Sequence, residues 1–90
     1  MHYTHRPTVG ELTTGDRVLF GDRREPLTVT DVDDVTEREG TIRIRSRAEL
    51  EGPRGGRVIL EGTSTGRTRA KVGQASWSPA YTVDDLQVVT

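Results

Sequence analysis

The 90-residue chain contains no cysteine, a single lysine and only two histidines. Without cysteine it has no disulfide, no thiolate metal ligand and no cysteine nucleophile, and a small domain that lacks disulfides is typical of a reducing compartment. Both histidines, His2 and His5, lie in the first five residues, where a general base or a metal ligand would lack rigid support. We therefore expect a cytoplasmic protein that is not an enzyme and has no catalytic residue, no cofactor and no metal site.

Long apolar runs and aromatic residues are also scarce. The longest apolar run, Val58–Leu60, is far too short to cross a bilayer, and the N-terminal stretch has no apolar segment typical of a signal peptide. Aromatic residues make up 4% of the chain, so its core must be built mainly from valine, leucine and isoleucine. These features predict one soluble domain with a modest core and no membrane partner.

The apolar residues that are present recur with a period of two, which is typical of β-strands. In Thr41–Arg47, for example, Ile42 and Ile44 should face one way and the intervening arginines the other. No segment carries the apolar stripe of an amphipathic helix. The pattern predicts strands at Arg17–Phe20, Leu27–Thr30, Thr41–Arg47, Arg57–Glu61, Arg67–Val72 and Gln87–Val89, a bulge or strand end at 31–35, a loop at 36–40 and one helical turn at 83–86.

Five or six short antiparallel strands joined by glycine-rich turns, such as Gly52–Gly56 and Gly62–Gly66, favour a small closed barrel, because an open meander would leave two unpaired edges. We expect residues 1–11 to form a flexible N-terminal segment and residues 12–90 a single β-barrel domain. No calcium-binding loop, phosphate-binding loop or catalytic triad is present in the sequence.

Between Leu12 and Val89 the chain resembles an SH3-like barrel. The resemblance rests on the opening Gly15-Asp16-Arg17-Val18, a long bent second strand, three hairpin-linked strands and a short turn at Tyr81–Leu86 before the last strand. It implies an all-β barrel with one short helical turn before the final strand, and an OB-like barrel is the alternative. Because such barrels serve many functions, the resemblance names none.

Basic residues are concentrated in the middle of the chain. Residues 1–40 carry five arginines and nine carboxylates, whereas residues 41–71 carry eight basic and three acidic residues. If strand alternation holds, these eight residues form a basic outer surface that could bind nucleic acid through its phosphates. The predicted basic face comprises Arg43, Arg45, Arg47, Arg54, Arg57, Arg67, Arg69 and Lys71.

A plainer interpretation of these arginines stays open. The chain has twelve arginines to one lysine, a bias that GC-rich codon usage of the haloarchaeal or actinobacterial kind produces without any functional meaning. Glu49, Glu51 and Glu61 could also pair with the arginines across strands and divide the basic face.

A second candidate site is an interaction groove at Trp77 and Tyr81, two neighbouring aromatic residues near the end of the chain. The alternative is that Trp77 closes the end of the barrel together with Tyr81 and Phe20. The sequence thus predicts a binding module whose partner is nucleic acid or another protein, bound at a strand edge or at this groove. We expect it to be a monomer or a weak homo-oligomer.

Overall fold

The computed structural model describes residues 6–73 and 79–89, and it is an all-β structure with one short 3₁₀ turn. The turn, η1, spans Val9–Glu11. The strands are β1 (Arg17–Leu19), β2 (Leu27–Glu39), β3 (Ile42–Glu51), β4 (Arg57–Thr63), β5 (Thr68–Gly73), β6 (Tyr81–Val83) and β7 (Gln87–Val89).

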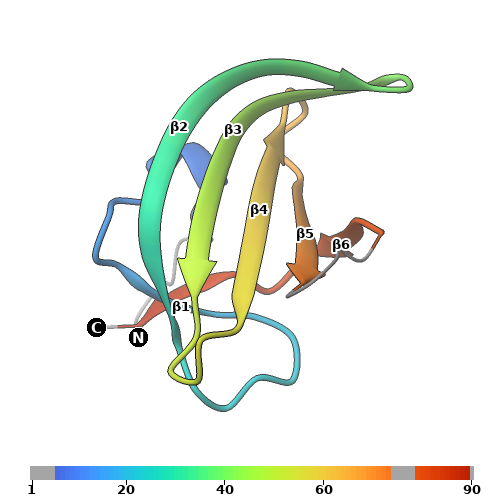
Figure 1. The fold of residues 1–90 in the computed structure, drawn as a ribbon. Coiled ribbons are helices and arrows are strands. Elements are labelled where there is room, and N and C mark those ends of the chain that lie inside the picture. The colour runs from blue at the N-terminus through green and yellow to red at the C-terminus, as the bar shows by residue number, and fades with distance from the viewer. Residues whose placement is uncertain (1–5, 74–78, 90) are drawn as a thin grey trace, which may run out of the picture.

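The seven strands form one antiparallel sheet in the order β6-β5-β4-β3-β2-β1-β7. Strands β2 to β5 follow one another as hairpins, and the first strand pairs with both β2 and β7. The sheet curls into a half-barrel, with the long β2–β3 hairpin arching over its upper end (Figure 1). The prediction of an antiparallel all-β fold is confirmed, but the described residues contain seven strands rather than five or six, and their sheet is an open half-barrel rather than a closed barrel.

The predicted helical turn at 83–86 is wrong. Val83 is instead the last residue of β6, opposite Thr68 of β5, and the chain then bends at Asp84 and enters β7 at Gln87. Val83 and Leu86 both have buried side chains in the core, which fixes the segment in an extended course.

The core lies inside the curl of the sheet and follows the predicted alternation. It contains alternate residues of the central strands together with residues from the loops that close the ends: Leu12, Val18, Phe20, Leu27, Val29, Ala48, Leu50, Val58, Leu60, Ala70, Val83 and Leu86, with Val9 from η1. Phe20 is thus a core residue. No helix in the described ranges is long and apolar enough to span a membrane.

The N-terminal part of the described chain also contributes to this core. Val9 is fully buried, and the backbone N–H of Thr8 donates to the Glu11 carboxylate at 2.8 Å, which fixes the turn. Gly62 of β4 permits the close approach, since a Cβ there would lie 3.1 Å from the Cβ of Val9. Val9, which lies before the predicted domain start at Leu12, is therefore part of the core.

The β2–β3 hairpin departs most from expectation. The predicted loop at 36–40 is strand up to Glu39, and the hairpin closes at Gly40, whose φ of 62° suits glycine. The ladder between β2 and β3 is irregular at 29–31 and 34–37, and that between β3 and β4 at 44–46, as in β-bulges.

The bulge in β3 changes which side chains share a face. Arg47 lies opposite Glu61 and Ile44 opposite Thr63, so Ile44 lies on the same side of the sheet as Arg47. Ile44 is buried there, outside the main core. The prediction that Ile42 and Ile44 face one way and all three arginines the other is therefore wrong, because one extra residue reverses the alternation.

Candidate functional site

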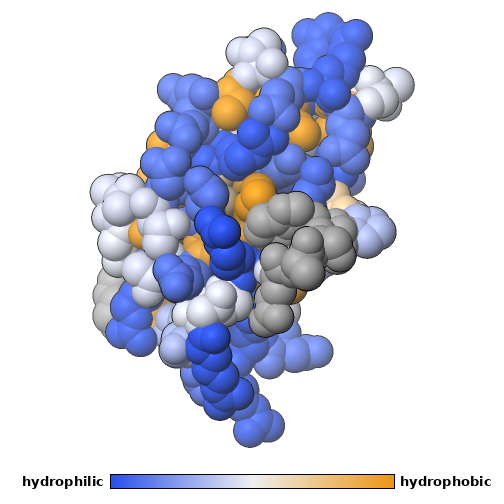
Figure 2. Space-filling model, in the orientation of Figure 1, coloured by the Kyte–Doolittle hydropathy of each residue, from blue (hydrophilic) through white to orange (hydrophobic). Residues whose placement is uncertain are grey.

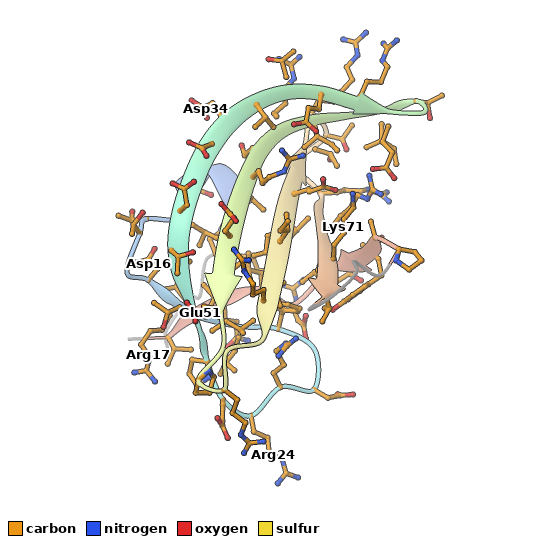
Figure 3. The ribbon with its side chains drawn as sticks, in the orientation of Figure 1. Asp16, Arg17, Arg24, Asp34, Glu51 and Lys71 are labelled. Atoms are coloured by element: carbon orange, nitrogen blue, oxygen red, sulfur yellow. The ribbon has the colours of Figure 1, made fainter. Side chains whose placement is uncertain are left out.

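Six charged side chains, which we call the charge cluster, gather where the arch of the hairpin approaches β4 and β5. They come from four strands and are Glu37, Glu39, Arg47, Glu61, Arg69 and Lys71. Figure 3 shows Lys71 on β5 below the arch. With three acidic and three basic members, the cluster has no net charge.

The cluster is held by a chain of ion pairs. Arg47 donates two hydrogen bonds to Glu37, at 2.7 and 2.6 Å, and its Nη2 lies 3.4 Å from Glu61 Oε2. Lys71 Nζ lies 3.6 Å from Glu61 Oε2 and 3.5 Å from Glu39 Oε2, while Arg69 Nη2 donates to Glu39 Oε1 at 3.1 Å. These contacts tie the end of β2 to β5 across the sheet.

Glu61 is the buried centre of the cluster. Only 1% of its side chain is exposed, and its Oε1 has no hydrogen-bond partner among the described residues. A carboxylate so far from water must be compensated by its cationic neighbours. Arg47 and Lys71 therefore compensate the charge of Glu61 within the cluster.

The ion pairs lower the pKa of two carboxyl groups. The hydrogen bonds from Arg47 lower the pKa of Glu37, and those from Arg69 lower the pKa of Glu39. Because each folded pKa lies below the unfolded one, these pairs stabilise the fold above about pH 4.3, and their contribution is lost as the pH falls through the lowered values.

We expect the E37Q/E39Q double variant to lose less stability on acidification than the wild type. The neighbouring Asp31 raises the pKa of Asp33, so the contribution of Asp33 to stability has the opposite pH dependence. Asp33 is the same in the variant and in the wild type, so this contribution does not distinguish the two proteins. Urea midpoints measured from about pH 7 down to pH 3 check this, since the range spans the ordinary titration of glutamate. Parallel pH curves for the two proteins would contradict it.

A groove of about 580 Å³ lies beside the charge cluster, between the tip of the hairpin, the β4–β5 turn and β6. Its lining contains three arginines, Arg43, Arg67 and Arg69, and no carboxylate among the described residues. The other residues that line it are Thr41, Ile42, Thr63, Ser64, Thr65, Ala80, Tyr81 and Thr82. We call this surface the arginine groove.

Backbone and hydroxyl contacts fix the walls of the arginine groove. The β4–β5 turn is closed by a hydrogen bond from Gly66 N–H to the Thr63 carbonyl, and Arg67 N–H donates to Thr63 Oγ1 at 3.1 Å. The N–H of Ser64 donates to the carbonyl of Arg43 at 2.9 Å, which joins this turn to the hairpin. The two walls are thus held together without using the Arg43 or Arg67 guanidinium groups.

Arg69 belongs to both the charge cluster and the groove. Its side chain is 13% exposed, Nη2 contacts Glu39, and Nη1 is buried without a hydrogen-bond partner among the described residues. Arg43 and Arg67 are exposed and form no ion pair within the described part of the chain. The arrangement offers cationic and hydroxyl donors to an anion.

The structure therefore divides the predicted basic face. Arg43, Arg67 and Arg69 line the arginine groove together with Tyr81, and Arg45 lines an adjoining hollow that shares Thr63, Ser64 and Arg67 with the groove. Arg47 and Lys71 belong to the charge cluster. Arg54 and Arg57 lie at the opposite end of the sheet, near Glu25 and Glu49 respectively. Trp77 lies outside the described residues, so its predicted role in a groove or a barrel plug stays open.

Sequence reasoning missed the hydroxyl-bearing residues and Ile42 of the groove. A signal was present, because Thr63-Ser64-Thr65 is followed closely by Arg67, and serine and threonine hydroxyls are common phosphate ligands. Within the described ranges no three histidine or acidic side chains are grouped so that they could hold a metal ion. The surface in Figure 2 is largely hydrophilic, with small separate apolar spots.

Comparison with protein-family models, with curated proteins and with solved structures finds no match to this chain. The fold and the groove define a small all-β protein with an open half-barrel and a cationic groove at one end. The geometry of the half-barrel and its groove is therefore the basis for inferring its function.

Proposed function

We propose that the protein is a non-enzymatic binding module that holds the sugar–phosphate backbone of a single-stranded nucleic acid in the arginine groove. The observation that carries this proposal is the composition of the groove, in which three arginines and five serine or threonine side chains line a hollow without a described carboxylate. Guanidinium groups bind phosphate through two parallel hydrogen bonds, and hydroxyls supply further donors.

The groove supports recognition of the backbone rather than of base sequence. Tyr81 is 45% exposed and is the one aromatic side chain among the described lining residues, so it offers a single surface on which a base could stack. We expect binding to be weak, with a dissociation constant of about 1–100 µM at physiological salt, as is usual for contacts to phosphate alone.

We also propose that the fold is of the SH3-like type. The long bent β2, the consecutive hairpins from β2 to β5 and the pairing of the last strand with the first support it. The chain departs from the SH3-like pattern at Asp84, where it has a bend instead of the expected helical turn before the last strand.

Fluorescence anisotropy with labelled single-stranded RNA and DNA tests the function. If three arginines contact phosphates, the logarithm of the binding constant should fall against the logarithm of the salt concentration with a slope of about −2. This slope corresponds to roughly a 20-fold loss of affinity from 50 to 200 mM salt. A duplex of the same length should bind less tightly, because its paired bases cannot stack on Tyr81. No binding at low salt, or binding that ignores salt, would rule out the proposal.

One observation favours protein binding as a second candidate. Beyond Val29, strand β2 pairs only with β3 among the described strands, so its other edge is open to strand addition. Asp31, Asp33 and Asp34 lie along this edge, and acidic residues there discourage unselective pairing. A partner strand would need basic side chains, and its capture would depend on these aspartates and not on the arginine groove.

A further inference from the structure

A second cavity, of about 300 Å³, lies at the end of the sheet opposite the arginine groove. It is bounded by the loop between β1 and β2, the turn between β3 and β4, and the adjoining ends of β4 and β5. Arg24, which lines it, is at the lower end of the molecule in Figure 3. We call this hollow the end cavity.

The end cavity combines an apolar interior with a cationic rim. Leu27 and Val58 are core residues that are each 2% exposed, and Val72 is partly buried against the core, so these three residues form an apolar floor to the hollow. Four arginines line the same hollow, against one described carboxylate, Glu25: Arg23, Arg24, Arg54 and Arg57.

The neighbouring carboxylates leave most of this positive charge available. Arg54 lies 3.4 Å from Glu25 and Arg57 lies 3.7 Å from Glu49. Three of these side chains are more than half exposed and Glu49 is 43% exposed, so such pairs contribute little. The guanidinium of Arg23 lies 5.3 Å from the centre of the Phe20 ring, a cation–π contact that holds it near the rim.

We propose that the end cavity binds a small carboxylate carried on a short apolar chain. The apolar part would contact Leu27, Val58 and Val72, and the carboxylate would meet the arginines of the rim. The volume is at the lower limit of small-molecule sites, which favours a free acid of a few carbons over a longer acyl chain. This site is independent of the function proposed for the arginine groove.

A titration of ¹⁵N-labelled protein with hexanoate, followed by NMR, tests the site. Hexanoate should shift the amides of Leu27, Gly56 and Val58 in a saturable manner and leave those of Ser64 and Thr65 unchanged. Hexylamine, with the same chain and the opposite charge, should bind at least about tenfold more weakly, because the rim is cationic. Equal binding of the two, or no saturable shift, would overturn the proposal.

A filled cavity provides the matched variant. Gly56 lines the end cavity, its φ is outside the left-handed range, and a Cβ there meets nothing within 4 Å. We therefore expect G56L to fold and to weaken hexanoate binding at least about tenfold, whereas T65L in the distant turn should not. Tighter binding of a leucine-terminated peptide than of hexanoate would overturn the assignment to a free acid.

Discussion

Replacing Glu61 with glutamine is expected to lower the free energy of unfolding by about 2–3 kcal/mol, although the side chain keeps its size. Glu61 is almost fully buried and lies within 3.6 Å of both Arg47 and Lys71. Losing one member of a buried ion pair usually costs about 3–5 kcal/mol, because the remaining charge is left uncompensated. The expected cost is smaller here, since Arg47 and Lys71 are 29% and 28% exposed and keep Glu37 and Glu39 as partners.

Urea denaturation of E61Q and of E49Q provides the comparison. Glu49 also carries an ion pair, with Arg57 at 3.7 Å, but both of its members are exposed. Its loss should therefore change stability by less than about 0.5 kcal/mol. If E61Q unfolds at the same urea concentration as E49Q, the charge cluster does not stabilise the fold.

A double-mutant cycle separates the interaction energy of the Glu61–Lys71 pair from the cost of burying a single charge. When Glu61→Leu is combined with Lys71→Met, the double variant should be more stable than the sum of the two single effects predicts, by at least about 0.5 kcal/mol. Additive effects would show that Glu61 and Lys71 do not interact, whatever their distance.

Much of the sheet could be predicted from the sequence, because its signals are local. Alternation in Arg57–Glu61 and in Arg67–Val72 predicts β4 and β5, and Leu60 and Ala70 are buried in the core as that pattern requires. The glycine-rich segments at 52–56 and 62–66 likewise contain the turns, which lie at 53–55 and 64–66, although Gly62 and Thr63 are still part of β4.

The candidate site was harder to predict because it depends on long-range geometry. A single bulge near Ile44 reverses the alternation in β3, and no local sequence signal specifies on which side of it Arg47 will lie. The charge pattern of Thr36–Gly40 indicates a solvated loop, but the segment is a strand whose Glu37 and Glu39 reach cations on β3 and β5. The ion pairs join residues up to 32 positions apart in the chain, and the periodicity of the sequence does not reveal contacts at such separations.

Reversing two charges in the arginine groove is expected to weaken nucleic-acid binding by at least about 100-fold. In R43E/R67E, each substitution removes one phosphate contact and places a carboxylate near the backbone, and each should cost roughly tenfold. The slope of log K against log salt should move from about −2 to about −0.7, since Arg69 would be the one remaining arginine in the groove. Stability should change little, because both arginines are exposed and have no ion pair among the described residues.

The matched control is R54E/R57E, which changes the net charge of the protein by the same amount at the opposite end of the sheet. If binding depends on the groove, this control should keep its affinity to within about threefold, the change due to the overall field alone. Anisotropy titrations of both variants at one salt concentration therefore distinguish a localised site from general attraction. Equal losses of affinity in the two variants would contradict a localised site. They would mean that the net charge of the whole protein attracts the nucleic acid, because both variants change that net charge by the same amount.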